Sequence, residues 1–300
     1  MSNYATIRRY SLIIEKVDGK QFPTFDEIKN HLLRHDFNVS DRTLQRDIKQ
    51  LRYEFGVEIS YNRFKNGYYI DKELSDNIEG IVRFLEIANT ADLLIESLKE
   101  SKDTLDYISF EAQGSLKGIE NLKSLLFAIK NHRVINFSHE NFYEKTNSNH
   151  EVKPYLLKEY QNRWYLIGTI KPNDDFRTFG IDRFSNLEVS DTTFKPTYKK
   201  KASKLFENTI GLTYSLGDVE GVVLSFTPLQ GKYIKTLPMH SSQRIIVDNE
   251  KELQIKLRII PNFEFQQQIL KLGDNVKVLQ PQWLADEIKT VLTNTLKQYE

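Results

Sequence analysis

The sequence predicts an α+β protein built from several domains. Its 300 residues exceed what one hydrophobic core ordinarily organises, so two or three domains are expected. Apolar residues recur with helical spacing in the first part of the chain, whereas short alternating runs dominate residues 133–190. Strands and helices then alternate over residues 219–300, which is typical of a small α+β domain.

The composition is that of a globular protein, with 39% hydrophobic and 28% charged residues. The absence of cysteine excludes disulfides and thiolate chemistry, and it restricts any metal site to His and carboxylate ligands. No apolar run approaches the ~20 residues that span a bilayer, and the polar start lacks the apolar segment of a secretory signal. We therefore expect a cytoplasmic protein that does not enter a membrane. The net charge of +1 leaves nucleic-acid binding to be decided by the local arrangement of charge.

The N-terminal part of the chain predicts two helices before residue 40. Residues 5–18 place apolar side chains at spacings of three and four, which indicates an amphipathic helix. Thr24 and Glu27 form the Thr-x-x-Glu pattern of a capping box, so a second helix should begin there and end near Asp36.

A third helix and a hairpin are predicted next. Ser40 is a favourable N-cap for a helix over residues 41–55, and Gly56 follows its last turn, as helix-ending glycines do. Residues 57–70 are rich in β-branched and aromatic residues around an Asn66-Gly67 turn, which favours a β-hairpin. Three helices followed by a hairpin form the layout of a winged helix-turn-helix.

The helix predicted over residues 41–55 separates apolar residues from hydrogen-bond donors. Its apolar residues recur at helical spacing and should face the core: Leu44, Ile48, Leu51 and Phe55. The opposite face, named here the donor face, carries no carboxylate and consists of Arg42, Gln45, Arg46 and Lys49. Guanidinium groups bind guanine edges, glutamine pairs with adenine and lysine neutralises phosphate, so this face suits duplex DNA. A solvated basic helix face is the alternative interpretation.

Further candidates for DNA contact flank the donor face. Hydroxyls and backbone amides at a helix start can meet a phosphate, and a hairpin tip with two cations suits the DNA backbone or the minor groove. These candidates are Ser40 and Thr43 at the helix start and Arg63, Lys65 and Asn66 at the hairpin tip. Two carboxylates of the same helix are assigned structural roles. Asp41 suits the helix macrodipole, and Asp47, beside the core face, is expected to pair within the protein.

Beyond the hairpin, the sequence predicts helices and then short strands. Residues 74–118 carry two apolar groups at helical spacing, which indicates either a packed linker or a dimerisation element. A helix is expected over residues 120–131, and the runs over 133–190 favour a small antiparallel β-barrel or sandwich. Residues 191–217, rich in Lys and Thr, are expected to link this domain to the last one.

Two sets of motifs, in a consistent order, resemble those of one family. Residues 39–48 (VSDRTLQRDI) and 67–70 (GYYI) are similar to the recognition segment and the hairpin end of WYL-domain transcriptional regulators. Residues 163–168 (RWYLIG) contain the Trp-Tyr-Leu tripeptide itself. The segment from Val222 to Pro281 is similar to the C-terminal extension of the same proteins, so the resemblance covers nearly the whole chain.

The resemblance implies a fold, a partner and a ligand. It implies a homodimer that represses or activates transcription by binding duplex DNA, and a barrel that binds a nucleotide or single-stranded nucleic acid on a basic surface. The implied domains are a winged helix-turn-helix (1–72), a helical linker or dimerisation element (73–132), a WYL domain with an Sm/SH3-like β-barrel (133–190), a linker (191–217) and a ferredoxin-like α+β extension (218–300).

The resemblance also implies positions for the ligand in the expected barrel. Guanidinium groups bind phosphate bidentately, and a tyrosine can stack on a base while donating its hydroxyl. The matching positions are Tyr165, Arg177 and Arg183, with Tyr155 nearby, and His139 and His150 where the family often has Tyr and Arg. The alternatives are a half-buried structural role for Tyr165 and pairing of the arginines with Asp182 or another carboxylate. Trp164 alternates with Tyr165 on a strand and should face the core.

The sequence contains no convincing catalytic constellation. The glycines form no phosphate loop, no serine lies in Gly-x-Ser-x-Gly, and His31 and His35 lack the glutamate of the HEXXH zinc motif. We therefore expect a binding protein rather than an enzyme, with no metal and no cofactor. A second class of function stays open: a nucleic-acid-binding accessory protein whose barrel is the main binding surface and whose winged helix contacts another protein.

Overall fold

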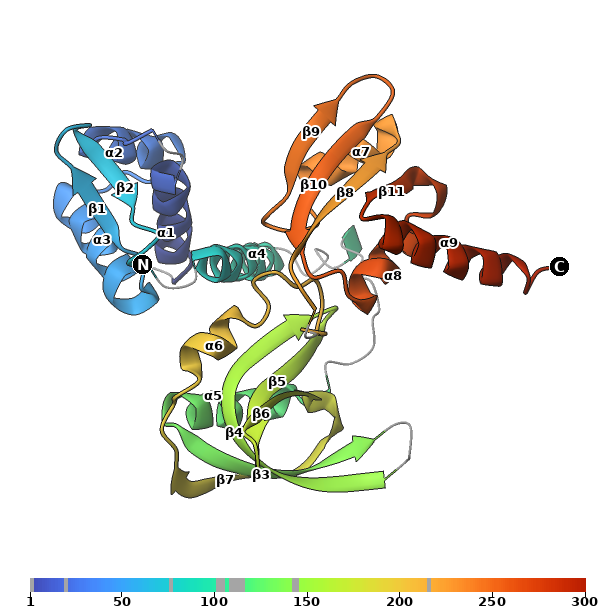
Figure 1. Ribbon diagram of the computed structural model, residues 1–300. Helices are drawn as coiled ribbons and strands as arrows, with labels where there is room; N and C mark the ends of the chain where they lie inside the picture. Colours follow the sequence, from blue (N-terminus) through green and yellow to red (C-terminus); the bar gives the residue numbers. More distant parts are fainter. Residues whose placement is uncertain are drawn as a thin grey trace. The chain divides into compact units, whose positions relative to one another are not determined.

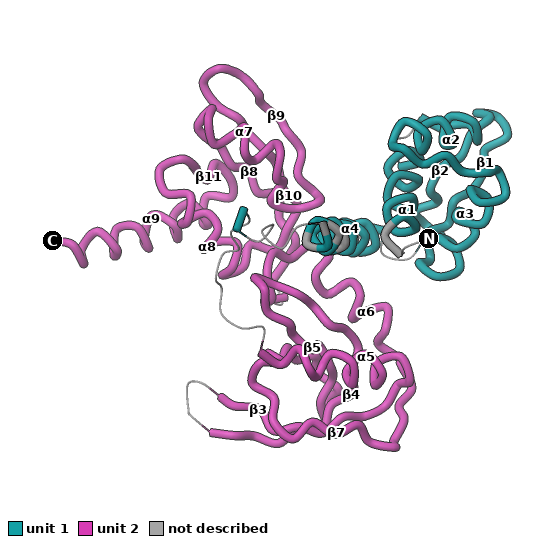
Figure 2. Tube along the Cα trace, turned by 180° about the vertical axis from the view of Figure 1, so that it is seen from behind, with its two compact units in different colours: residues 1–112 teal, residues 113–300 magenta. Residues whose placement is uncertain are grey.

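The computed structural model describes residues 3–18, 21–75, 78–100, 106–107, 117–141, 146–214 and 217–300 (Figure 1). The chain divides into two compact units, residues 1–112 and residues 113–300 (Figure 2). Unit 1 combines helices with a two-stranded hairpin, and unit 2 holds two antiparallel sheets with helices. The expected α+β class is thereby confirmed. Within the described ranges, no helix has both the length and the hydropathy that a bilayer-spanning segment needs.

Unit 1 begins with three helices and a hairpin in the predicted order. The elements are α1 (Asn3–Asp18), α2 (Phe25–Arg34), α3 (Asp41–Phe55), β1 (Ile59–Asn62) and β2 (Gly67–Ile70). The predicted capping box forms at the start of α2, where Glu27 Oε2 accepts from the Thr24 N–H at 2.7 Å and the Thr24 hydroxyl accepts from the Glu27 N–H. The helix ends at Arg34, before the expected Asp36, whose backbone is left-handed with φ 68°.

Helix α3 has the predicted ends and the predicted inner face. Ser40 Oγ accepts a hydrogen bond from the Thr43 N–H at 3.2 Å, and Gly56 takes the left-handed conformation with φ 67°. The predicted inward residues all contact the hydrophobic core of unit 1: Leu44, Ile48, Leu51 and Phe55. The amphipathic pattern of residues 41–55 therefore orients this helix as expected.

The hairpin differs from the prediction at its turn. The sequence predicts a turn centred on Asn66-Gly67, but residues 63–66 form the tip and Gly67 is the first residue of β2. Only glycine fits there, because a Cβ at position 67 would lie 1.7 Å from the carbonyl oxygen of Phe22. Packing against a distant loop, rather than the conformation of the turn, requires this glycine.

An ion pair lies inside the core of unit 1. The side chains of Arg9 in α1 and Asp47 in α3 are 2% and 0% exposed, and the arginine Nε donates to the aspartate Oδ2 at 2.6 Å. A second donation, from Nη2 to Oδ1, measures 3.3 Å. The structural pairing predicted for Asp47 is confirmed, and it ties α3 to α1.

Helix α4 (Ile78–Glu100) extends unit 1 beyond the hairpin. Its first half packs on the core through Leu85, and the Asn89 amide donates to the Ser11 hydroxyl of α1 at 2.7 Å. Leu93 and Ile95 of the second predicted apolar group are about half exposed. Of the predicted helical region, residues 101–105 and 108–116 and the side chain of Leu98 lie outside the described residues.

Unit 2 begins with a helix and a five-stranded antiparallel sheet of order β6-β5-β4-β3-β7. The elements are α5 (Leu122–Lys130), β3 (Arg133–Asn141), β4 (Thr146–Tyr160), β5 (Arg163–Ile170), β6 (Asp175–Gly180) and β7 (Phe184–Thr193). Leu125 of α5 shares a core with Phe137 and Leu166 of the sheet, and Trp164 packs against that core as predicted. Bulges in β3 and β4 curve the sheet.

The expected Sm/SH3-like barrel is not closed by strand pairing. Strands β6 and β7 are the two edges of the sheet, and no backbone pairing between them occurs in the described residues. After Gly180 the chain makes the short turn η3 (Ile181–Arg183), and β7 then pairs with β3 on the far edge. The turn carries the chain from the β6 edge to the β7 edge, but these two strands do not pair. The sheet is therefore curved but open.

The second sheet of unit 2 has a β-α-β-β-α-β order. The segment expected to be a linker comes first and contains the short helix α6 (Lys199–Lys204), whose Ala202 is buried. The elements that follow are β8 (Glu220–Phe226), α7 (Pro228–Thr236), β9 (Arg244–Asp248), β10 (Leu253–Ile259), α8 (Phe263–Lys271), β11 (Val276–Gln280) and α9 (Gln282–Leu296). The strand order β11-β8-β10-β9 is that of a ferredoxin-like sheet.

Removing one member of the buried ion pair should destabilise unit 1 strongly. Arg9→Met leaves the buried Asp47 charge without its two hydrogen bonds and with only the Arg46 guanidinium at 3.8 Å, so the free energy of unfolding should fall by about 3–5 kcal/mol. The double variant Arg9→Met with Asp47→Leu removes both charges and should recover most of that loss. Urea denaturation followed by circular dichroism measures both effects. A single variant with wild-type stability would contradict the structural role of the pair.

Candidate functional site

The donor face of α3 is exposed along the helix, as predicted: Arg42, Gln45, Arg46 and Lys49 all face solvent. The Arg46 guanidinium lies 3.8 Å from an Asp47 oxygen, but that carboxylate is already held by Arg9 at 2.6 Å. No hydrogen bond or ion pair within the described part of the chain holds the side chains of Arg42, Gln45 or Lys49. The donor face therefore keeps its hydrogen-bonding capacity for a ligand.

The start of α3 is organised by hydroxyl groups and one ion pair. Ser40 Oγ, which caps the helix, lies 3.0 Å from Thr43 Oγ1. Asp41 Oδ1 accepts from the Lys29 ammonium of α2 at 2.6 Å. The carboxylate at the start of the helix is thus paired, and the positive character of the exposed face persists to the helix start.

Tyr53 extends the donor face and was not predicted from the sequence. Its side chain is 80% exposed. Positions 42, 46, 49 and 53 recur at spacings of three and four, so they lie on one side of an α-helix. That spacing is the signal that could have indicated it. A tyrosine there offers a ring for stacking and a hydroxyl for a phosphate.

The hairpin tip presents the other predicted DNA contacts. Arg63 and Lys65 are exposed, and the Lys65 ammonium lies 4.0 Å from the centroid of the Phe22 ring. Asn66 is also exposed, and its side-chain oxygen accepts a hydrogen bond from the Tyr61 hydroxyl. Two cations thus stand on a backbone that other side chains hold in place.

In unit 2, two histidines lie in a cluster of aromatic rings. His139 of β3 and His150 of β4 have ring centroids 6.2 Å apart. The Phe179 ring lies 5.5 Å from the His139 ring and 5.1 Å from the His150 ring. The strands bring the histidines together because His150 pairs in register with Phe137, two residues before His139.

Both imidazoles are electrostatically biased toward the neutral form. Burial, the Arg183 guanidinium and His150 together lower the pKa of His139 to about 4. Burial, followed by the Arg177 guanidinium, lowers the pKa of His150. The fixed positive charge at this place therefore comes from the two arginines. The Nε2 atom of His139 is buried and has no hydrogen-bond partner among the described residues, so its hydrogen-bonding capacity is not used there.

The carboxylate of Asp182 lies at the edge of this cluster. It pairs with the Arg163 guanidinium at 3.6 Å. A Cβ at position 180 would lie 2.7 Å from Asp182 Oδ1 and 3.1 Å from Arg183 Nε, so both side chains fold over Gly180. Arg177 is exposed on β6. The structure thus gathers four of the predicted ligand residues, named here the arginine–histidine site: His139, His150, Arg177 and Arg183.

The two predicted tyrosines are placed differently. Tyr165 is half-buried, which raises its pKa, and it interacts electrostatically with Arg183, so it borders the arginine–histidine site. Tyr155 packs in another aromatic cluster, with its ring centroid 5.3 Å from Phe194 and 5.7 Å from Phe176. A bulge in β4 at this point interrupts the alternation of side chains. Tyr155 therefore holds the segment before α6 rather than joining the four residues.

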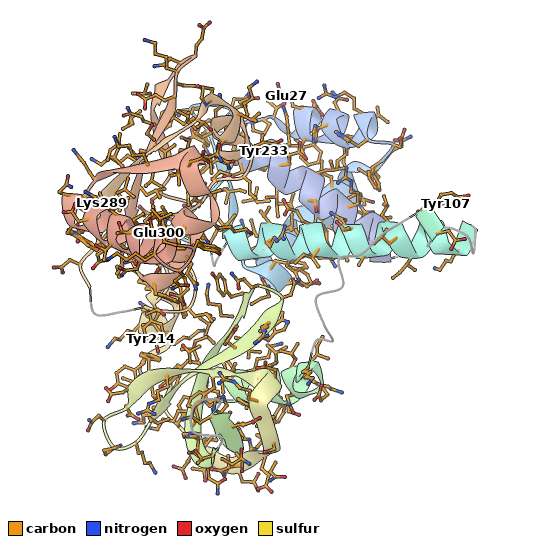
Figure 3. The ribbon with its side chains drawn as sticks, turned by 90° about the vertical axis from the view of Figure 1, so that its right-hand side faces the viewer. Glu27, Tyr107, Tyr214, Tyr233, Lys289 and Glu300 are labelled. Atoms are coloured by element: carbon orange, nitrogen blue, oxygen red, sulfur yellow. The ribbon has the colours of Figure 1, made fainter. Side chains whose placement is uncertain are left out.

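The segment between the two sheets of unit 2 is packed near its end. Tyr214 lies between the sheets (Figure 3), where it is half-buried and interacts electrostatically with Arg177 of β6. Glu264 Oε1 of α8 accepts from the N–H groups of Leu212 and Thr213 at 3.2 and 3.1 Å. The segment that ends at Tyr214 is thus connected to the last domain through hydrogen bonds.

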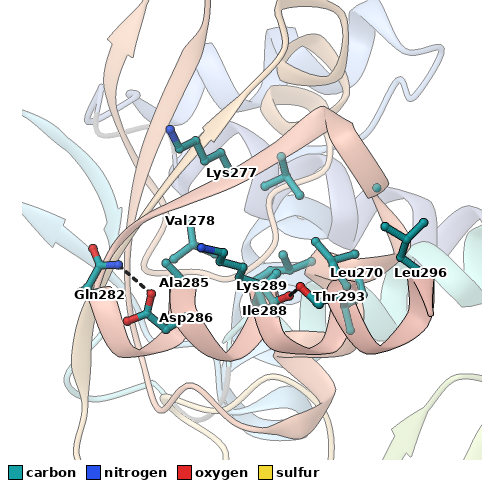
Figure 4. A pocket seen from close by; sticks show the side chains of 14 residues that line it. Leu270, Lys277, Val278, Gln282, Ala285, Asp286, Ile288, Lys289, Thr293 and Leu296 are labelled. Atoms are coloured by element: carbon teal, nitrogen blue, oxygen red, sulfur yellow. Dashed lines mark hydrogen bonds between the residues drawn. The ribbon is translucent and has the colours of Figure 1, made fainter.

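The last domain contains a groove of about 520 Å³ between α8, β11 and α9 (Figure 4). Leu270, Val278 and Ile288 make its wall apolar, and Lys277 and Lys289 add positive charge to the lining. The Gln282 amide donates to Asp286 at 2.9 Å at one end of the groove. The sequence predicts no site here, because the groove forms only when three consecutive elements fold against one another.

Comparison with known proteins identifies two domains. Residues 120–189 match the WYL domain and residues 218–296 match the WCX domain. No curated protein matches the chain. Among solved structures, the chain is similar to proteasome accessory factor B/C (PafBC) of Arthrobacter aurescens, with 18% identity, a TM-score of 0.33 and coverage of 95% of this chain and 45% of that one. It is also similar to a CRISPR Cas-related protein, with 14% identity, a TM-score of 0.41 and coverage of 99% and 85%. The chain thus spans less than half the length of the PafBC chain.

The neutral state of His139 predicts a pH-dependent stability. An unfolded histidine takes up a proton near pH 6.5, whereas His139 does so only near 4, so the unfolded chain binds more protons between these values. The free energy of unfolding should therefore fall as the pH drops from 6.5 toward 4. His139→Phe keeps a ring and should weaken this dependence, whereas His35→Gln on the surface should not. Urea denaturation at several pH values tests this, and equal slopes for wild type and His139→Phe would refute it.

Proposed function

Because the chain carries a WYL domain followed by a WCX domain, it belongs to the WYL-domain proteins, and we propose that it is a ligand-responsive DNA-binding transcriptional regulator. The observation that carries this proposal is the exposed donor face of α3. Four long donors without a competing carboxylate match the acceptors of base edges and phosphates in duplex DNA. The order of three helices and a hairpin in unit 1 is that of a winged helix-turn-helix.

In this proposal, α3 lies in the major groove as the recognition helix. Its first half carries Arg42, Gln45 and Arg46, which are placed to contact bases, while Lys49 neutralises a phosphate. The cations of the hairpin tip bind the backbone or the minor groove. A homodimer would present two such helices to an inverted repeat, with half-site centres one helical turn, ~34 Å, or a multiple apart.

The arginine–histidine site is the proposed ligand sensor. Its two guanidinium groups suit phosphate, and its aromatic rings suit a base, so a nucleotide or single-stranded nucleic acid is the proposed ligand. Such a ligand controls DNA binding only if it binds one dimer arrangement better than another. The electrostatic interaction of Tyr214 with Arg177 and the hydrogen bonds that Glu264 accepts from the adjacent segment offer a route by which the site would affect the WCX domain.

A base contact and a phosphate contact should respond differently to truncation. Arg46→Ala should cost about 1–3 kcal/mol of binding free energy and relax specificity at one base pair. Lys65→Ala should weaken binding to all DNA sequences alike. It should also lower the slope of log affinity against log salt concentration by about 1. Fluorescence anisotropy with duplexes selected from a random pool measures both, with Lys289→Ala as a control cation in the WCX domain. Unchanged affinity and specificity in Arg46→Ala would refute the assignment of the donor face.

The ligand assignment has its own test. Arg177→Gln and Arg183→Gln should each weaken binding of a short single-stranded oligonucleotide or a nucleotide by about 1.5–3 kcal/mol, because each removes a charge-assisted hydrogen bond. Arg133→Gln, which alters the Asp191 pair away from the site, is the matched control. Duplex affinity without ligand should be unchanged in all three. If single strands bind better than any duplex and depend on these arginines, the accessory-protein function is supported instead.

A further inference from the structure

The tip of the hairpin in unit 1 carries a fully exposed aromatic ring. Phe64 has 102% of its reference surface in contact with solvent and stands between Arg63 and Lys65. Apolar surface of this size is ordinarily removed from water, because its burial is favourable. Most exposed apolar side chains in the described parts of the chain lie on helices or strands, whereas Phe64 is at the end of a turn that projects from a sheet.

The turn that holds this ring is built by side-chain hydrogen bonds. The Asn62 side-chain oxygen accepts from the N–H groups of both Phe64 and Lys65, each at 3.0 Å. The Tyr61 hydroxyl donates to Asn66, and the Lys65 ammonium rests on the Phe22 ring at 4.0 Å. The backbone of the tip is therefore held by these contacts, and the Phe64 ring takes part in none of them.

The hairpin is in turn fixed to the body of unit 1. The Tyr68 N–H donates to the Pro23 carbonyl at 2.8 Å, and Gly67 lies directly against the backbone of Phe22. At the other end, Arg52 of α3 pairs with Glu58 at 2.6 Å, just before β1. The position of the tip relative to α2 and α3 is therefore set before any ligand arrives, which lowers the entropic cost of using it in binding.

We propose that Phe64 is a wedge that enters the minor groove of duplex DNA and partly unstacks one base step, while Arg63 and Lys65 bind the flanking phosphates. This inference rests on the proposed function. Apolar wedges of this kind kink DNA by about 20–90° toward the major groove. The kink is least costly at flexible pyrimidine–purine steps, so Phe64 would select such a step without hydrogen-bonding its bases. A protein partner would require a broad apolar patch, whereas a single ring between two cations suits DNA.

The test compares Phe64→Ala and Phe64→Leu with the wild-type chain. The probe is a duplex selected from a random pool by the wild-type protein, labelled at both ends so that energy transfer reports bending. Wild type and Phe64→Leu should bend the duplex, while Phe64→Ala should bind about tenfold more weakly and leave it nearly straight. Tyr299→Ala, which removes another exposed ring at the far end of the chain, should match wild type.

The outcomes separate the wedge from the proposed function. If wild type binds the duplex and Phe64→Ala has the same affinity and the same bend, the wedge is overturned and the regulator proposal stands. A weaker Phe64→Ala complex with an unchanged bend overturns the wedge as well. If the wild-type chain selects no duplex at low salt, the regulator proposal fails, and the wedge fails with it.

Discussion

The buried pair of Arg9 and Asp47 fixes the orientation that the apolar face of α3 favours. A helix with an apolar face and a basic face still has some rotational freedom against a core of interchangeable aliphatic side chains. A carboxylate that is 0% exposed and held by a guanidinium at 2.6 Å removes that freedom, because any rotation would break the pair and leave a buried charge alone. The donor face is exposed because the apolar residues of α3 face the core and this internal contact holds them there.

The local arrangement of basic side chains, rather than the net charge, gives this protein its positive surfaces. The whole chain carries a formal net charge of only +1, yet positive groups gather at three places: the donor face, the hairpin tip and the arginine–histidine site. At two of these places the nearby carboxylates are paired: Asp41 with Lys29 and Asp47 with Arg9 at the donor face, and Asp182 with Arg163 at the arginine–histidine site. Local pairing of acidic groups therefore keeps the potential at these two places positive although the net charge is small.

The sequence predicted what depends on neighbours along the chain and failed where distant segments meet. Caps at Ser40 and Thr24 and the inner face of α3 follow from local spacing, and the structure has them. The need for Gly67 arises from the carbonyl of Phe22, and a bulge in β4 separates Tyr155 from the expected ligand residues. The open edges of the curved sheet likewise depend on which strands pair, which no local pattern reveals.

A tethered cleavage experiment tests the central claim most directly. Because the chain contains no cysteine, Gln45→Cys creates a unique attachment point on the donor face for an iron chelate that cuts nearby DNA. We expect cleavage of a selected duplex at the centre of each half-site when the chelate is at position 45. We expect no such cuts when the chelate is attached through Arg177→Cys in the WYL domain. Cleavage of the duplex from position 177 and none from position 45 would contradict the central claim.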